Sequence, residues 1–278
     1  MIIDFHVHIG NYGKTKGLGE WSKVTLKALL EYLNKRKVDK AVLLPVDNLE
    51  RRASGYCCYT SDVIKIYEEL PEKFVPFFSL DPREKSVEHK VRKYLEVGCK
   101  GFGEHKVRLP IDHPYNQRLY KICEKYDIPI LIHTDNNYNF DVIGLKNLEK
   151  IVSEFSNLTF IMHGPGWWRE ISTNISLEVT YPKGKVTPGR VQYLLEEYEN
   201  IYGDLSAYSG YNALARDLEH ARTFLVRFAD KLLYGSDLVD FFKPEASLIE
   251  LLRQLNLPER AYESILWKNA LRLLKYVD

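Results

Sequence analysis

The sequence predicts a single-domain (β/α)8 barrel of the TIM type that spans residues 1–278. Short apolar runs alternate with amphipathic helical stretches along the whole chain, as expected for parallel strands joined by helical crossovers. Eight such pairs fit a closed barrel of this length. The alternative, a doubly wound open sheet, is disfavoured because no glycine-rich phosphate loop follows the first apolar run.

Eight apolar runs have the length of buried strands. The first, residues 2–8, reads Ile-Ile-Asp-Phe-His-Val-His. The other seven are expected at residues 40–46, 74–80, 100–106, 129–133, 158–163, 201–205 and 231–237.

Helical stretches separate these runs. The first, residues 26–37, repeats leucine at helical spacing. Further helices are expected at residues 61–70, 86–97, 116–126, 144–155, 189–199, 213–228, 244–255 and 259–276. Residues 164–185 are the exception, because this segment is rich in Gly, Pro and Trp and is expected to be an irregular loop.

Composition and charge narrow the class of protein. The formal net charge is +1, so no overall field attracts nucleic acid or a membrane, and no apolar run could cross a bilayer. The first residues lack the basic and apolar regions of a signal peptide, so the cytoplasm is the expected location. The four cysteines lack zinc-knuckle spacing and are expected to be reduced, mostly buried thiols; they are Cys57, Cys58, Cys99 and Cys123.

The first predicted strand ends in two histidines. Side chains alternate along a strand, so His6 and His8 point the same way, together with Asp4. Two imidazoles on one face are half of a metal site for zinc or a related transition metal. The alternative is a pair of hydrogen-bonded core histidines.

Polar residues also mark the ends of later predicted strands. In a parallel barrel, all carboxyl ends meet at one rim, where active sites lie. The candidates at this rim are His6, His8, Glu104, Lys106, His133, His163 and Asp237. Each has an ordinary alternative, such as a strand cap for His133, a turn for His163, a helix cap for Asp237 or a surface ion pair for Glu104. Their joint placement favours a metal site.

These residue types suit metal-assisted hydrolysis. Imidazole and carboxylate hold a divalent ion and leave a position for water, whose pKa falls from about 16 to about 7. Asp237 can bind the ion and take the proton from water. His163 can polarise the substrate oxygen or hold a second ion.

The ordered motifs His6-Val7-His8, His133, His163-Gly164 and Gly235-Ser236-Asp237 resemble the amidohydrolase superfamily. The closer likeness is to its amidohydrolase-related branch, which includes aminocarboxymuconate semialdehyde decarboxylase and related aromatic-acid decarboxylases. Residues 265–274 are similar to the final helix of that branch, so the resemblance spans essentially the whole chain.

The resemblance implies a divalent metal, with zinc expected, held as one or two ions. His6, His8, His133 and Asp237 match the ligands of single-metal members, and His163 matches the residue that assists water or substrate. In two-metal members a carboxylate or modified lysine bridges the ions. Glu104 is the candidate for that bridge and Lys106 a weaker one, and His133 and His163 would then serve the second ion. Residues 101–106 depart from the Gly-Ile-Lys-Leu pattern of the branch, which leaves ion number and reaction open.

The long segment 164–185 is expected over the same rim as a lid or pocket wall, with a subunit contact as the alternative. Its aromatic residues Trp167, Trp168 and Tyr181 would supply apolar contacts, and Arg169 would meet an anionic group. Other residues that could reach the rim are Asp4, Asn11, Asp135, Asn136, Asp204 and Tyr208.

The leading functional hypothesis is a metal-dependent hydrolase in which a metal-activated water attacks an amide, ester or lactone carbonyl of a small molecule. The alternative is a non-oxidative decarboxylase of a small aromatic acid that uses the same site. A metal-stabilised binding protein and a phosphoesterase of the polymerase-and-histidinol-phosphatase type rank lower. No nucleic-acid or membrane partner is expected, and a homo-oligomer stays open.

Overall fold

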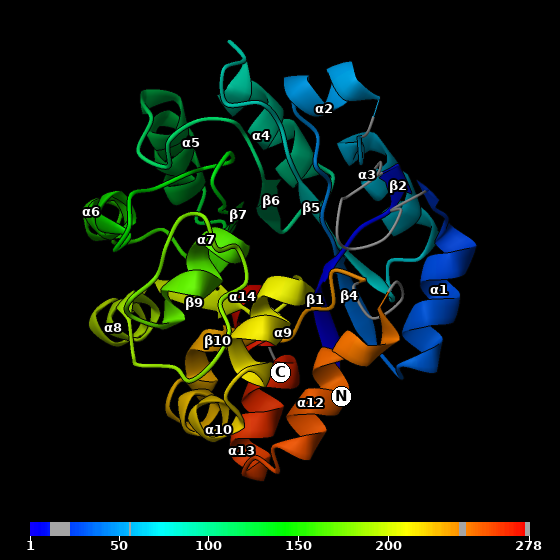
Figure 1. Ribbon diagram of the computed structural model, residues 1–278. Coiled ribbons are helices and arrows are strands. Elements are labelled where there is room, and N and C mark those ends of the chain that lie inside the picture. Colours follow the sequence, from blue (N-terminus) through cyan, green and yellow to red (C-terminus); the bar gives the residue numbers. More distant parts are fainter. Residues whose placement is uncertain (12–22, 56, 239–242, 276–278) are drawn as a thin grey trace.

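Eight parallel strands form a nearly closed barrel (Figure 1), which confirms the predicted fold class. The computed structural model describes residues 1–11, 23–55, 57–238 and 243–275. The strands, in their order around the sheet, are β1 (Ile3–Val7), β4 (Lys40–Leu43), β5 (Phe74–Phe78), β6 (Gly101–His105), β7 (Ile130–His133), β8 (Phe160–His163), β9 (Ile201–Asp204) and β10 (Leu232–Leu233). Each lies within or next to an apolar run that predicts it.

The barrel closes where the first and last strands meet. The Phe5 amide donates to the Tyr234 carbonyl at 2.9 Å, and the Asp237 amide donates to the His6 carbonyl at 2.8 Å. These two bonds join β1 to the segment that follows β10. Residues 6 and 237 therefore become neighbours at the same rim.

Helices surround the strands in Figure 1. Their bounds are α1 (Leu26–Lys35), α2 (Leu49–Ser54), α3 (Thr60–Glu69), α4 (Val87–Glu96), α5 (Pro114–Lys125), α6 (Lys146–Glu154), α7 (Pro165–Trp168), α8 (Arg190–Glu197), α9 (Ala207–Ala215), α10 (Leu218–Arg227), α12 (Leu248–Gln254), α13 (Glu259–Glu263) and α14 (Asn269–Leu273). Short 3-10 turns lie at Arg169–Ile171, Ala229–Lys231 and Pro244–Ala246, and a π-helical turn at Ser264–Lys268 joins α13 to α14.

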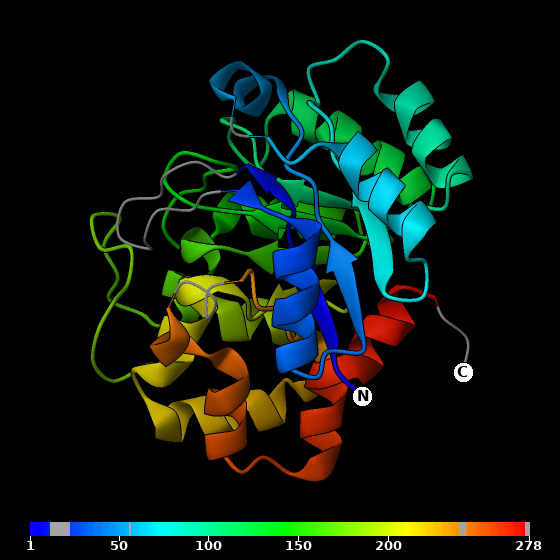
Figure 2. The ribbon, with the colours of Figure 1, turned by 90° about the vertical axis from the view of Figure 1, so that its right-hand side faces the viewer.

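Apolar side chains from six strands fill the interior of the barrel. One buried cluster joins Ile3, Phe5, Val42, Leu44, Val75, Phe77, Leu131, Ile161 and Leu233. The rings of Phe5 and Phe77, on strands that are not neighbours, pack edge to face with centroids 5.8 Å apart. Ala270 and Leu274 join this cluster from the C-terminal helix. Figure 2 shows that helix at the same end of the barrel as the N-terminus, so the filled end lies opposite the rim that carries the site.

Several predicted elements differ from the structure. The single helix expected at 213–228 is wrong, because α9 ends at Ala215 and the Asp217 side chain caps the start of α10 by accepting from the His220 amide. The irregular loop expected at 164–185 begins with α7 and a 3-10 turn instead. Helix α2 and an antiparallel pair formed by β2 (Gly10–Asn11) and β3 (Lys23–Val24) were not predicted.

Two further predictions concern the chain as a whole. All four cysteines are buried and free of disulfides, as predicted. Within the described ranges, no helix has the length and apolar character that crossing a membrane requires. The last residue of the helix expected at 259–276 lies outside the described residues.

Candidate metal centre and its pocket

Two histidines at the end of β1 form the start of the site. The Nε2 atoms of His6 and His8 lie 2.8 Å apart, although a register irregularity interrupts the pairing of β1 with β4 between Asp4 and Val7. The outer nitrogen of each ring faces an acceptor: Nδ1 of His6 lies 2.6 Å from Asp204 Oδ2, and Nδ1 of His8 lies 2.6 Å from the Leu44 carbonyl. With Nδ1–H donating outwards, both Nε2 lone pairs face one point.

Asp237 reaches this pair because of the barrel closure. The Asp4 carboxylate accepts from the amides of His6 and Ser236, at 3.2 and 2.9 Å, and so ties β1 to the segment after β10. Gly235 permits the close approach, since a Cβ there would lie 2.8 Å from Asp204 Oδ1 and 2.9 Å from His6 Cβ. Asp237 itself has a φ of 48°, a left-handed conformation that aspartate adopts more readily than most residues.

The donor atoms of His6, His8 and Asp237 satisfy a distance test for one ion. Two metal–ligand bonds of about 2.1 Å limit the separation of two ligand atoms to about 4.2 Å. The Asp237 Oδ1 atom lies 3.4 Å from His8 Nε2 and 3.8 Å from His6 Nε2. All three separations fall below this limit, and the donor set of two imidazoles and a carboxylate is one that zinc accepts.

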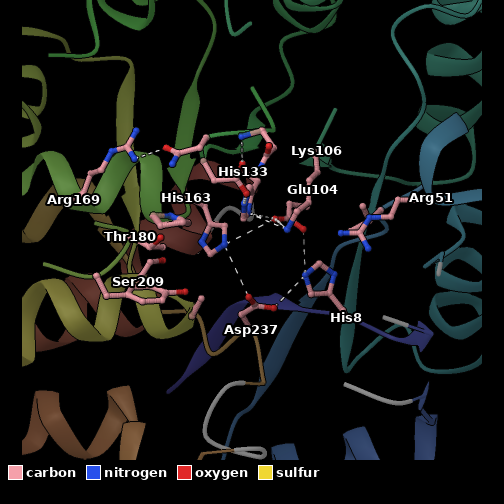
Figure 3. Close-up of a pocket in the computed structure, with 17 residues that line it drawn as sticks. His8, Arg51, Glu104, Lys106, His133, His163, Arg169, Thr180, Ser209 and Asp237 are labelled. Carbon is pink, nitrogen blue, oxygen red and sulfur yellow. Dashed lines mark hydrogen bonds and ion pairs between the residues drawn. The ribbon is translucent and has the colours of Figure 1, made fainter. Parts of the chain in front are cut away.

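A second group of donors lies beside the first (Figure 3). His6, Glu104 and His163 also present atoms within 4.8 Å of one another. His163 Nε2 lies 3.9 Å from Glu104 Oε1 and 4.0 Å from Asp237 Oδ2. Glu104 Oε2 lies 3.6 Å from His8 Nε2, so this carboxylate faces both groups. That placement is what a bridging carboxylate requires.

His133 lies at the edge of these groups. Its pairing with His163 in the β7–β8 register sets the two rings 5.3 Å apart. Its Nδ1 lies 2.8 Å from Glu104 Oε1, and its Nε2 lies 3.0 Å from Asp135 Oδ2. His133 belongs neither to the donor group of His6, His8 and Asp237 nor to that of His6, Glu104 and His163. Its link to both groups is its contact with the Glu104 carboxylate.

Lys106 and Asn139 support this edge. The Lys106 Nζ lies 3.6 Å from Glu104 Oε1 and 3.3 Å from His133 Nδ1. The buried Asn139 amide donates to the carbonyls of His105 and His133, at 2.7 and 3.0 Å, and so joins the ends of β6 and β7.

Asp204 and Ser206 contact the Nδ1 atoms of His6 and His163, on the side of each ring away from the metal donors. Asp204 Oδ2 accepts from the Ser206 hydroxyl at 2.8 Å and lies 3.3 Å from His163 Nδ1, besides its contact with His6. The Ser206 Oγ lies 3.0 Å from His163 Nδ1. Both imidazoles are therefore held through Nδ1, which leaves Nε2 of each ring facing the neighbouring donor atoms, as is usual for metal-bound histidine.

The surroundings of the buried carboxylates favour their ionised form. Burial alone would raise the pKa of Glu104, but the charges of Lys106 and His133 outweigh it and hold that pKa well below its usual range. Burial is likewise outweighed at Asp237 by His6 and His8, and at Asp204 by His6 and His163, so both pKa values are lowered. Ionised carboxylates are the form that binds a cation.

A pocket of about 300 Å³ opens over these donors. Its wall includes Asp237, Glu104, Lys106, His8, His133, His163, Arg51, Asp135, Asn136, Arg169, Thr180 and Tyr181. The segment 164–185 therefore contributes to the wall, as expected, through Arg169, Thr180 and Tyr181. The expected role of Trp167 and Trp168 is wrong, because both rings are buried in the core outside the barrel and Trp168 Nε1 donates to the Asp204 carbonyl.

The remaining rim candidates lie in different places relative to the pocket. Asp135 and Asn136 line the pocket, whereas Tyr208 does not and instead packs its ring against Tyr181, which does. The side chain of Asn11 lies outside the described residues. Sequence reasoning missed Ser206 and Arg51; Ser206 follows a predicted strand end, whereas nothing in the local pattern around Arg51 indicated a pocket.

A comparison with known families identifies the chain's relatives. A family model described as amidohydrolase matches residues 3–276. No curated protein matches the sequence.

Solved structures share the barrel. An amidohydrolase from Burkholderia multivorans with bound zinc is 14% identical, with a TM-score of 0.67 and 99% of each chain covered. A probable 2-pyrone-4,6-dicarboxylic acid hydrolase from Acinetobacter baumannii is 13% identical, with a TM-score of 0.63 and 99% of each chain covered. A 5-carboxyvanillate decarboxylase from Sphingomonas paucimobilis is 14% identical, with a TM-score of 0.62 and 99% of this chain and 98% of that chain covered. At such identities the likeness shows the fold alone.

Proposed function

Because the chain belongs to the amidohydrolase family, we propose that it is a metal-dependent hydrolase of a small molecule. The proposed reaction is hydrolysis of an amide, ester or lactone, with zinc as the expected metal. Residues 1–278 would form this one catalytic unit.

One observation carries the proposal: His6, His8 and Asp237 direct three donor atoms at one point within the span that a single ion allows. Two imidazole lone pairs 2.8 Å apart repel each other unless a cation or a proton lies between them. A divalent ion at this point supplies positive charge that polarises a carbonyl and lowers the pKa of water.

The protein supplies the base for hydrolysis. Asp237 Oδ1 faces the histidine pair, while Oδ2 faces His163 Nε2 at 4.0 Å and remains available to accept a proton from water. Burial would raise the pKa of Asp237, but His6 and His8 outweigh it and lower that pKa, which favours the unprotonated form that can accept a proton. His163 Nε2, with Nδ1 held by Ser206, can accept a hydrogen bond or bind an ion but does not donate in this tautomer.

The second candidate is a non-oxidative decarboxylase on the same site. It is favoured by Arg169, a pocket residue whose buried Nε has no hydrogen-bond partner among the described residues and whose charge suits a substrate carboxylate. The fold is compatible with both reactions, since a hydrolase and a decarboxylase both share it.

The experiment is turnover by chelated and zinc-restored protein with two substrate panels. One panel contains small amides, esters and lactones, followed by release of acid; the other contains aromatic acids, followed by release of carbon dioxide. Hydrolysis that is lost on chelation and restored by zinc supports the proposal, whereas carbon dioxide release alone supports the second candidate.

Two variants sharpen this experiment. Asp237→Asn should lower hydrolysis by at least about 100-fold, the usual contribution of a positioned base. Asp217→Asn, at a helix cap away from the pocket, is the matched control and should keep wild-type turnover. Turnover that persists after complete metal removal would contradict the proposal.

A further inference from the structure

We propose that Asn139, which is fully buried and does not line the pocket, is the positioning residue for the ion that Glu104 binds. This inference rests on the proposed function, because it concerns the metal centre of that same site. It follows from the way in which the ends of β6 and β7 are held side by side, next to the Glu104 and His133 side chains.

The strand pairing alone does not set the distance between these two strand ends. The pairing of β7 with β8 is regular up to the last residue of each strand. The pairing of β6 with β7 is irregular between Phe102 and His105, and Glu104 lies within this stretch. A regular ladder, which would fix the place of Glu104 relative to His133, is therefore interrupted where the site needs it.

The Asn139 side chain joins the two strand ends at this point. Its Nδ2 donates to the carbonyls of His105 and His133, at 2.7 and 3.0 Å. Because one nitrogen contacts both oxygens, the two carbonyls cannot move apart without breaking one of these bonds. His105 directly follows Glu104, so the bond to its carbonyl also restrains the main chain that carries the Glu104 carboxylate.

Neighbouring groups fix the orientation of the Asn139 amide. Carbonyl oxygens only accept, so the Asn139 nitrogen must face the two strand ends and its oxygen must face the other way. That oxygen accepts from Asn116 Nδ2 at 3.3 Å, and the same nitrogen of Asn116 donates to the Pro110 carbonyl at 2.9 Å. Asn116 Oδ1 in turn lies 3.0 Å from His105 Nε2. A flipped Asn139 amide would therefore leave buried polar atoms unpaired, which is costly.

The main chain at residue 139 favours asparagine. Its φ is 41°, a left-handed conformation that asparagine adopts more readily than most residues. The Asn139 amide also donates to the Val107 carbonyl at 2.9 Å, which ties this residue to the segment after β6. Both features place the side chain between the two strand ends.

These bonds restrain donor atoms of the proposed metal centre. Glu104 Oε1 lies 2.8 Å from His133 Nδ1 (Figure 3), and Glu104 Oε2 lies 3.6 Å from His8 Nε2. A shift of the end of β6 would change both separations. An ion tolerates such a shift poorly, because its bonds to ligands stay within about 0.2 Å of their preferred lengths.

The donor group of His6, His8 and Asp237 does not depend on Asn139 in this way. It is held by β1 and by the segment after β10, which the Asp4 carboxylate joins through the amides of His6 and Ser236. An ion bound there without Glu104 should therefore keep its affinity when Asn139 is replaced.

The test is the affinity of each zinc equivalent in Asn139→Asp protein, measured by competition with chromophoric chelators. Anomalous diffraction from wild-type crystals loaded with one and with two equivalents identifies the ion in contact with Glu104. The substitution keeps the shape of the side chain but removes both donations. The ion at Glu104 should bind about tenfold to 100-fold more weakly, the range for outer partners of metal ligands. An ion without Glu104 should bind as in the wild type.

The matched control is Asn269→Asp. Asn269 is also buried, and its Nδ2 donates to two carbonyls, those of Ala229 and Leu232, at 2.7 and 2.8 Å. None of these three residues lines the pocket. Both variants should unfold at a lower urea concentration than the wild type, but only Asn139→Asp should lose zinc affinity. A merely structural role of Asn139 predicts the same zinc affinity for both variants.

Asn139→Gly is a second variant that keeps the test open if Asn139→Asp does not fold. Glycine adopts the left-handed main chain without strain and places no charge against the two carbonyls. It should weaken the ion at Glu104 in the same direction.

The inference is overturned if no zinc ion of the wild type contacts Glu104, if a folded Asn139 variant binds that ion like the wild type, or if Asn269→Asp weakens it equally. Hydrolysis by the wild type tests the proposed function separately. A protein with an Asn139-dependent zinc ion at Glu104 that hydrolyses no amide, ester or lactone would refute the hydrolase and keep the inference. Zinc-dependent hydrolysis with wild-type zinc affinity in the Asn139 variants would do the reverse.

Discussion

Replacing Asp204 by asparagine would perturb the proposed metal centre without changing the pocket wall. Asp204 is fully buried, and its Oδ2 lies 2.6 Å from His6 Nδ1 and 3.3 Å from His163 Nδ1. Asparagine keeps the shape of the side chain and removes its charge. The imidazole of His6 then loses the ionised acceptor that fixes its tautomer and strengthens its Nε2 as a ligand.

The expected loss follows from these contacts. A hydrogen bond to a charged group contributes about 1.5–3 kcal/mol and a neutral one about 0.5–1.5 kcal/mol, a difference of about 1–2 kcal/mol. For His6 alone, this difference predicts zinc binding that is about fivefold to thirtyfold weaker. A simultaneous loss at His163 would bring the effect towards about 100-fold, the upper range for outer partners of metal-bound histidines.

The assay is zinc affinity measured by competition with a chromophoric chelator, with circular dichroism to confirm the fold. Ser206→Ala removes neutral contacts to the same two rings and one hydrogen bond to Asp204, but it leaves the Asp204 charge in place, so it should weaken zinc binding less than about tenfold. Asp217→Asn should leave zinc affinity unchanged, because its contacts are with the start of α10, Val186 and Lys185, none of which lines the pocket. Wild-type zinc affinity in a folded Asp204→Asn protein would refute the reasoning.

Two further predictions concern stability and reactivity. Burial would raise the pKa of Asp81, but hydrogen bonds from Arg83 outweigh burial and lower that pKa. The ionised Asp81 side chain therefore stabilises the fold at any pH above its unfolded-state pKa. This stabilisation is lost as the pH falls through the pKa of Asp81 in the folded protein. Asp81→Asn should therefore cost about 2 kcal/mol in urea unfolding at neutral pH and much less in acid; an equal cost at both would contradict this. Burial raises the pKa of Cys99 to about 12, so iodoacetamide should label it slowly in native protein and rapidly in urea; equal rates would show that the thiol is accessible.

The sequence predicted the barrel and the residues at its rim for a specific physical reason. Buried parallel strands are apolar along their whole length, so a histidine or aspartate where the run stops stands out, as at His133 and His163. The barrel fold then requires that such ends share one rim. The closure bond between Asp237 and His6, across most of the chain, follows from that rule.

Other features depend on tertiary contacts that local patterns do not carry. Trp167 and Trp168 lie in a Gly- and Pro-rich segment, yet α7 turns both rings into the core. Arg51 reaches the pocket from a six-residue helix whose composition is that of an ordinary exposed turn. The periodicity of residues 213–228 continues across Asp217, so only the cap formed by its side chain reveals the break.

The position of His133 shows a different limit. Its strand-end location was correct, but its role as a ligand of the first ion stays a prediction, since its two nitrogens face Glu104 and Asp135. A second ion between Glu104, His133 and His163 would use the same Nδ1. Spacing in the sequence cannot distinguish these arrangements, because it does not fix which atoms the ring nitrogens of His133 face.

The most direct measurement of the central claim is the metal content of purified protein together with anomalous diffraction at the zinc edge. We expect at least one equivalent of zinc and an anomalous peak in contact with His6, His8 and Asp237, and we expect both to be lost in the His6→Ala variant. Protein that takes up no zinc, or a peak away from these three side chains, would contradict the claim that they share one ion.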